Sequence, residues 1–64
     1  MSINQRVRWV AGGVFTGTVI NILAEDTVIS GYIFDHKGDL VVQPDKPQYK
    51  GQQVILDPNS VEVA

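Results

Sequence analysis

Two arginines near the start of the chain offer its first possible chemistry. Arg6 and Arg8 are two residues apart in "QRVRWV", so in an extended segment both side chains lie on the same side. Guanidinium groups spaced in this way can clamp an anionic group. The simpler interpretation, which we favour, is a solvated charged face that keeps an edge strand soluble.

The lone tryptophan has two interpretations. Trp9 alternates with the arginines and shares its side of the strand with Val7, a pattern typical of a buried strand face. One large aromatic ring can fill much of the centre of a small domain, and tryptophans are strongly buried on average. The alternative is an exposed stacking platform beside the arginines. The pattern favours the core position and predicts that the arginines face away from Trp9.

A second candidate site lies in the loop "PDKPQYKG". Its aromatic residue, Tyr49, lies between Lys46 and Lys50 and is the aromatic least needed for a core. Prolines stiffen the loop, which lowers the entropy lost on binding. We expect a contact surface that combines this loop with Tyr32 of "GYIF". In the competing interpretation, Tyr49 folds back and caps the open end of the domain.

No set of residues in the sequence fits a metal site or an active site well. "DHKGD" brings together Asp35, His36 and Asp39, but one histidine and two carboxylates in a turn make a poor zinc site. The chain has no cysteine, and no motif indicates an oxyanion hole or a phosphate loop. We therefore expect no enzyme activity, no metal and no cofactor.

Size and charge limit the remaining classes. With 64 residues, the chain is expected to form one domain, residues 1–64, whose stability is marginal and which self-association would help. The formal net charge of −2 argues against broad nucleic-acid binding, which needs clustered Lys and Arg. No apolar run reaches signal-peptide or membrane-span length, so we expect a soluble, cytoplasmic protein and no membrane partner.

Apolar residues recur with a period of two along most of the chain, which predicts short strands. Gly12 and Gly13 mark a tight turn, and Gly17 predicts a bend or bulge. We expect "TVISGYIF" to be one strand, with Val28, Tyr32 and Phe34 on one face and Ile29 and Ile33 on the other. The strands are expected at residues 5–10, 14–23, 27–34, 40–43, 52–56 and 61–64, with one helical turn at 57–60.

Strands this short need their edges protected, and a small barrel provides that protection. We therefore predict an all-β fold. Its architecture is a five- to six-stranded, SH3-like, partly open barrel with one short helical turn before the last strand.

Two stretches resemble known small barrels. The ending "GQQVILDPNSVEVA" resembles the end of an SH3-like barrel, in which a single helical turn (here Pro58 to Ser60) precedes the closing strand. The opening "VRWVAGGVFTGTVINI" is similar to tudor-like barrels, above all to the hypervirulence-associated tudor family of small bacterial proteins. The resemblance implies a small β-barrel, but the peptide groove of signalling SH3 domains is not implied, because their Ala-Leu-Tyr-Asp-Tyr stretch is missing.

These observations favour a non-enzymatic protein-interaction or adaptor module with a protein partner. One alternative is a nucleic-acid-associated barrel that uses a local basic and aromatic patch. Another is a subunit of a small oligomeric enzyme or ligand-binding assembly, since a homo-oligomer can build a pocket that no monomer contains. The candidate binding residues are Tyr49, Lys46, Lys50, Tyr32, Arg6 and Arg8.

Overall fold

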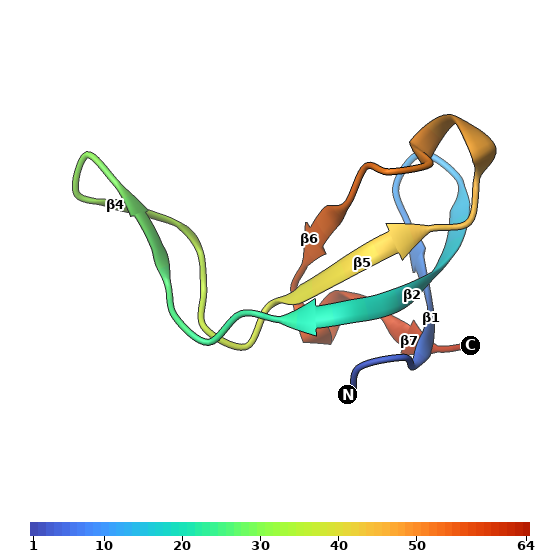
Figure 1. Cartoon of the computed structure of the whole chain (residues 1–64), viewed down its shortest axis with the longest axis horizontal. Helices are drawn as coiled ribbons and strands as arrows, with labels where there is room; N and C mark the ends of the chain where they lie inside the picture. Colours follow the sequence, from blue (N-terminus) through green and yellow to red (C-terminus); the bar gives the residue numbers. More distant parts are fainter.

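The computed structural model describes all 64 residues, which form seven β-strands and two short 3₁₀ helices (Figure 1). Along the chain these are β1 (Arg6–Val10), β2 (Val14–Ile22), β3 (Thr27–Ile29), β4 (Tyr32–Asp35), β5 (Leu40–Pro44), η1 (Pro47–Tyr49), β6 (Val54–Leu56), η2 (Pro58–Ser60) and β7 (Glu62–Val63). Five strands form an antiparallel sheet in the order β6-β5-β2-β1-β7, and β3 and β4 form a separate two-stranded sheet. The prediction of an all-β fold is confirmed.

The five-stranded sheet and its core make up what we call the body. Six residues are buried at its centre, contributed by β1, β2, β5 and the residue before β7: Val7, Trp9, Val19, Leu40, Val42 and Val61. Val54 on the edge strand β6 packs against the same cluster, so the sheet curves around it. The edge strands β6 and β7 do not pair with each other, so the barrel is not closed.

At Gly17, β2 lies too close to β5 to leave room for a side chain. A Cβ atom at this position would lie 2.6 Å from the carbonyl oxygen of Gln43 and 2.9 Å from Val42 Cγ1. The bulge in β2 lies further along, where the register shifts between Val19 and Asn21. Of the bend or bulge predicted at Gly17, the bulge is therefore not at this residue. Glycine is needed there because only a residue without a side chain lets the two backbones meet.

The residues after β6 form the predicted helical turn. The Asp57 carboxylate accepts a hydrogen bond from the Asn59 N–H at 2.8 Å, and Pro58 occupies the first helical position, where its missing N–H costs nothing. The turn leads into the buried Val61 and then β7. No helix in the structure has the length and apolar character needed to cross a membrane.

The segment 27–34 is not one strand, contrary to the prediction. Ser30 and Gly31 have positive φ angles, 52° and 80°, and form a two-residue turn that separates β3 from β4. The turn also changes which side chains share a face, because directly paired residues lie on the same side. Ile29 pairs with Tyr32 and Val28 with Ile33, so the expected grouping of Val28 with Tyr32 is wrong. We call this hairpin, Thr27–Asp35, the arm.

The arm extends away from the body along the longest axis of the molecule, opposite the loop that follows β5 (Figure 1). Its two strands pair only with each other. Its base is fixed by backbone hydrogen bonds from Leu23 N to Asp39 O and from Gly38 N to Leu23 O, both 2.9 Å. The arm is therefore anchored at its root, and its strands form no ladder with the strands of the body.

Candidate functional site

The rings of Trp9, Phe15 and Tyr49 form a contiguous aromatic cluster at one end of the body. Trp9 and Phe15 are paired across β1 and β2, and their ring centroids lie 5.6 Å apart in a stacked arrangement. Tyr49 meets Phe15 edge to face at 5.9 Å. Trp9 is only 6% exposed, which confirms the predicted core position. Tyr49 is half-buried over this stack, as in the capping interpretation.

Two further contacts hold the Tyr49 loop on the body. The Tyr49 carbonyl oxygen accepts a hydrogen bond from Gln43 Nε2 at 2.7 Å. The Lys46 ammonium lies 3.8 Å from the centroid of the Phe15 ring, a cation–π contact. Lys50 is exposed and ends η1. The loop is therefore packed on its own domain, and the expectation that it projects Tyr49 toward a partner lacks support from this geometry.

Arg6 is engaged by the same loop. Its guanidinium donates to both carboxylate oxygens of Asp45, with 2.8 Å between Nη1 and Oδ1, and Nη1 also donates to Thr18 Oγ1. The Thr16 hydroxyl donates to Asp45 Oδ2 at 2.6 Å. The hydrogen bonds from Arg6, and then from Thr16, lower the pKa of Asp45 to about 2 because they stabilise its ionised form. Arg6 thus ties the loop to β1 and β2.

Arg8 points toward the other edge of β1. Its Nη2 donates to Glu62 Oε2 at 2.6 Å, and the two residues are directly opposite each other in the pairing of β1 with β7. Both arginines face away from the core, as predicted, but each is paired with a carboxylate of its own chain. The anion clamp considered from the sequence would have to displace these partners.

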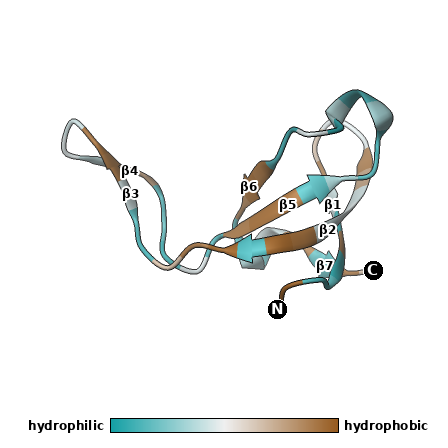
Figure 2. Ribbon diagram, in the orientation of Figure 1, coloured by the Kyte–Doolittle hydropathy of each residue, from teal (hydrophilic) through white to brown (hydrophobic).

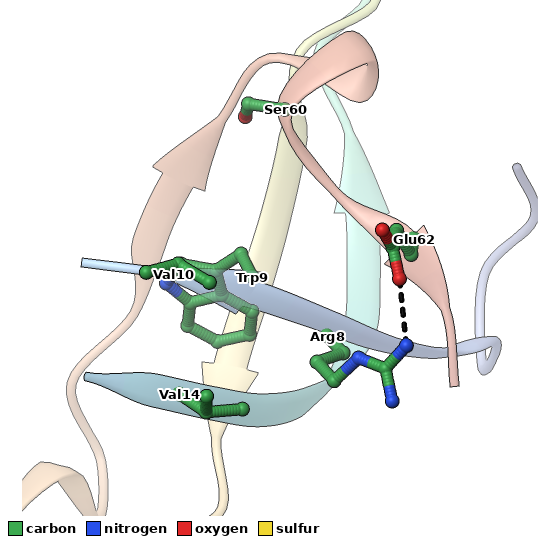
Figure 3. A pocket seen from close by; sticks show the side chains of 6 residues that line it. All are labelled: Arg8, Trp9, Val10, Val14, Ser60 and Glu62. Carbon is green, nitrogen blue, oxygen red and sulfur yellow. Dashed lines mark hydrogen bonds and ion pairs between the residues drawn. The ribbon is translucent and has the colours of Figure 1, made fainter.

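A pocket with a volume of about 380 Å³ lies beside Trp9 (Figure 3). Trp9, Val10 and Val14 provide its apolar lining, and the Arg8–Glu62 pair borders it on the side toward β7. Val10 and Val14 are 76% and 62% exposed. The pocket can take a small apolar group. The two charged side chains at its border, Arg8 and Glu62, already form an ion pair with each other.

The arm carries the largest concentration of exposed apolar side chains. Five of its residues are between 50% and 73% exposed: Val28, Ile29, Tyr32, Ile33 and Phe34. They lie on both faces of the two-stranded sheet, because the pair Ile29–Tyr32 and the pair Val28–Ile33 alternate in side. Figure 2 shows this apolar stretch bounded by hydrophilic residues toward the body. Single exposed apolar residues are normal, but five of them gathered on one short hairpin are typical of an interaction site.

The structure separates the predicted binding residues into three places. Lys46, Tyr49 and Arg6 gather at the loop after β5, with Lys50 next to them in sequence, and Arg8 lies near β7. Tyr32 is on the arm, at the opposite end of the molecule (Figure 1). The expected single contact surface of Tyr49 and Tyr32 is therefore wrong, because the Ser30–Gly31 turn makes residues 27–35 a projecting hairpin.

The Ser30–Gly31 dipeptide in the sequence indicates the arm, but the apolar residues on both sides of it resemble one continuous strand. Ser-Gly is a turn dipeptide, and here it lies between two short apolar runs. A hairpin of this length cannot bury both of its faces alone, so the same signal predicts exposed apolar residues.

The carboxylates of the "DHKGD" turn and of the preceding turn stabilise the root of the arm. Asp39 Oδ2 accepts a hydrogen bond from the His36 N–H at 2.9 Å, and Asp26 Oδ1 accepts one from the Lys37 N–H at 2.7 Å. The structure contains no group of three or more His, Cys, Asp or Glu residues that could hold a metal ion.

Comparisons of the chain with protein-family models, with curated proteins and with solved structures gave no significant match. The resemblance to the hypervirulence-associated tudor family remains a prediction.

Proposed function

We propose that this chain is a protein-interaction module whose docking element is the arm. The observation that carries the proposal is a hairpin with five exposed apolar side chains on two faces and no neighbouring strand on either edge. An isolated two-stranded hairpin is marginally stable in water. A partner that covers the arm would bury these apolar side chains, which stabilises the complex and the hairpin together.

The body serves in this proposal as an SH3-like or tudor-like scaffold that holds the arm. The strand order β6-β5-β2-β1-β7 and the 3₁₀ turn before the last strand support that assignment. A small rigid domain with one projecting element concentrates binding in a segment that its own core does not need.

The nucleic-acid alternative has less support. Arg6 and Arg8 each form an ion pair within the chain, and Lys46 lies over Phe15. Phosphate binding would have to compete with these contacts, and the chain as a whole is acidic.

The test is capture of proteins from the organism that encodes the chain, with immobilised wild type compared with two variants. Tyr32→Ser with Phe34→Ser makes the arm polar, whereas Val10→Ser with Val14→Ser removes exposed apolar surface from the body. We expect the arm variant to lose the captured proteins and the body variant to keep them. Equal capture by the arm variant would refute the arm as the docking element.

A further inference from the structure

We infer that the arm is the hinge of a domain swap between two copies of this chain. In the swapped form the Ser30–Gly31 turn opens, and residues 27–35 of the two copies pair with each other as continuous antiparallel strands. Each body is then built from residues 1–26 of one copy and residues 36–64 of the other. The inference goes beyond the proposed function and does not depend on it, because it rests on the turn and on strand pairing rather than on exposed side chains.

The arm divides the body into two parts that depend on each other. β1 and β2 precede the arm, and β5, β6 and β7 follow it. The sheet joins the two parts by pairing β2 with β5 and β1 with β7. The buried cluster takes three residues from the first part and three from the second: Val7, Trp9 and Val19, then Leu40, Val42 and Val61. Neither part encloses this cluster alone, so two copies that exchange one part re-form the same body twice.

The turn at the tip of the arm is the point where the sequence suits the hairpin least. Ser30 and Gly31 both have positive φ angles, 52° and 80°. Two-residue hairpin turns with positive φ at both positions favour Asn-Gly, and serine adopts such angles less readily than asparagine or glycine. Opening the turn returns both residues to extended backbone. Residues 27–34 then form one strand, which their β-branched and aromatic composition favours.

The strand pairing within the arm can be repeated between two copies. Ile29 pairs with Tyr32 and Val28 pairs with Ile33, so these pairs are centred between Ser30 and Gly31. A twofold axis through that point reproduces the same pairs between two extended strands and adds pairs of Ser30 with Gly31. The swapped form therefore keeps the pairs of the arm and removes its turn.

The position of the arm leaves room for the exchange. The arm extends away from the body along the longest axis of the molecule (Figure 1), and its strands pair only with each other. Opening the turn therefore breaks no strand pair of the body. Nine extended residues span roughly 30 Å, so the two bodies lie at opposite ends of the paired strands.

The balance between the two forms depends on the turn and on protein concentration, because the contacts within the body are the same in both. In the monomer the arm links the two parts at an effective concentration in roughly the millimolar range. The swapped dimer therefore competes at about 1 mM protein and is absent at micromolar concentrations. Exchange requires β2 to separate from β5, so it takes place during refolding rather than between folded molecules.

Refolding from urea at about 10 µM and at about 1 mM, followed at once by size-exclusion chromatography, tests the inference. We expect the wild type to elute as a monomer of 7.0 kDa after dilute refolding and to contain a dimer after concentrated refolding. Trp9 emission reports that the body is folded in each species.

Two variants of the turn should shift this balance in opposite directions. Gly31→Val should raise the dimer fraction, because a β-branched residue is unfavourable at positive φ. A Cβ atom at position 31 meets nothing within 4 Å, so this change acts through the backbone angle. Ser30→Asn gives the preferred Asn-Gly turn and should lower the dimer fraction. The concentrations that give half dimer should differ between the two variants by about tenfold or more.

Cross-linking distinguishes the swap from any side-by-side dimer. Arg8 and Glu62 are exposed and lie opposite each other in β1 and β7, and the chain has no cysteine of its own. The Arg8→Cys and Glu62→Cys chains are unfolded together, refolded at about 1 mM and oxidised. The swap places these positions of different copies side by side, so the mixed disulfide should exceed both homodisulfides. The same chains mixed after folding are the control and should show no such excess.

A wild type that refolds at about 1 mM only as a monomer would overturn the inference, and so would a dimer without an excess of the mixed disulfide. Equal dimer fractions for Ser30→Asn and the wild type would overturn the turn as the hinge. This last comparison does not require Gly31→Val to fold, because Ser30→Asn preserves the hairpin.

Discussion

Valine and isoleucine side chains meet opposite surroundings in the body and in the arm. Val7, Val19 and Val42 are completely enclosed, whereas Val28 and Ile29 are more than half exposed. The local sequences are alike, since both regions consist of short β-branched runs separated by turns. The difference is what the strand faces contact: β1, β2 and β5 share a buried cluster of side chains, whereas β3 and β4 form a separate two-stranded sheet. A strand buries its apolar face only where the fold supplies a second surface.

Trp9→Ala should have the largest effect, because it removes the largest side chain of a core formed by six buried residues. We expect a loss of about 3–5 kcal/mol in the free energy of unfolding, which leaves little of a domain this small folded. The matched change in the arm, Tyr32→Ala, should alter stability by less than about 0.5 kcal/mol. Urea unfolding followed by far-UV circular dichroism at low micromolar concentration measures both. Equal losses would remove the distinction between body and arm.

Gly17→Ala should come next, because its Cβ atom would press against the Gln43 carbonyl oxygen and force β2 away from β5. We expect a loss of about 1–3 kcal/mol. Gly13→Ala is the control, since a Cβ atom there meets nothing within 4 Å and its φ is not in the left-handed region. Thermal melts of the two variants should differ clearly, and equal midpoints would contradict the close approach of the strands.

Tyr49→Ala tests whether the loop after β5 contributes to the stability of the body. Because Tyr49 lies edge to face on Phe15, we expect a loss of about 1–2 kcal/mol in the free energy of unfolding, whereas an exposed binding residue would cost less than about 1 kcal/mol. Lys50→Ala, the neighbouring exposed residue, should melt like the wild type. A Tyr49→Ala variant with the melting midpoint of the wild type would contradict this packing role and support Tyr49 as a partner-binding residue.

The smallest effect concerns acid stability. The folded pKa of Asp45 is about 2, below its ordinary value near 3.8, so its ionised form stabilises the fold. This contribution is fully present above about pH 4 and is lost as the pH falls toward 2. The Arg6–Asp45 ion pair is exposed to solvent, so its contribution is small. We expect its loss between about pH 4 and pH 2 to lower Tm by only about 2–4 °C. Asp45→Asn should make the melting temperature correspondingly less dependent on pH in this range, and high salt should reduce the difference.

Several features of the fold were predictable because they depend on local patterns. The alternation of Val7 and Trp9 with the arginines placed Trp9 in the core, and Asp57 followed by proline indicated the helical turn. The candidate site was less predictable. Arg6, Lys46 and Tyr49 have the residue types of a binding patch, but their partners, Asp45 and Phe15, are chosen by contacts between distant segments.

The sequence by itself determined that this chain forms short antiparallel strands, because side-chain alternation, β-branching and turn residues act over a few positions. Only the tertiary structure decided which apolar strands are buried. Residues 27–34 have the composition of a core strand, yet the positive φ angles of Ser30 and Gly31 fold them into a hairpin beyond the edge of the body. Burial depends on what lies opposite a residue in space, and no other strand of this chain pairs with the arm.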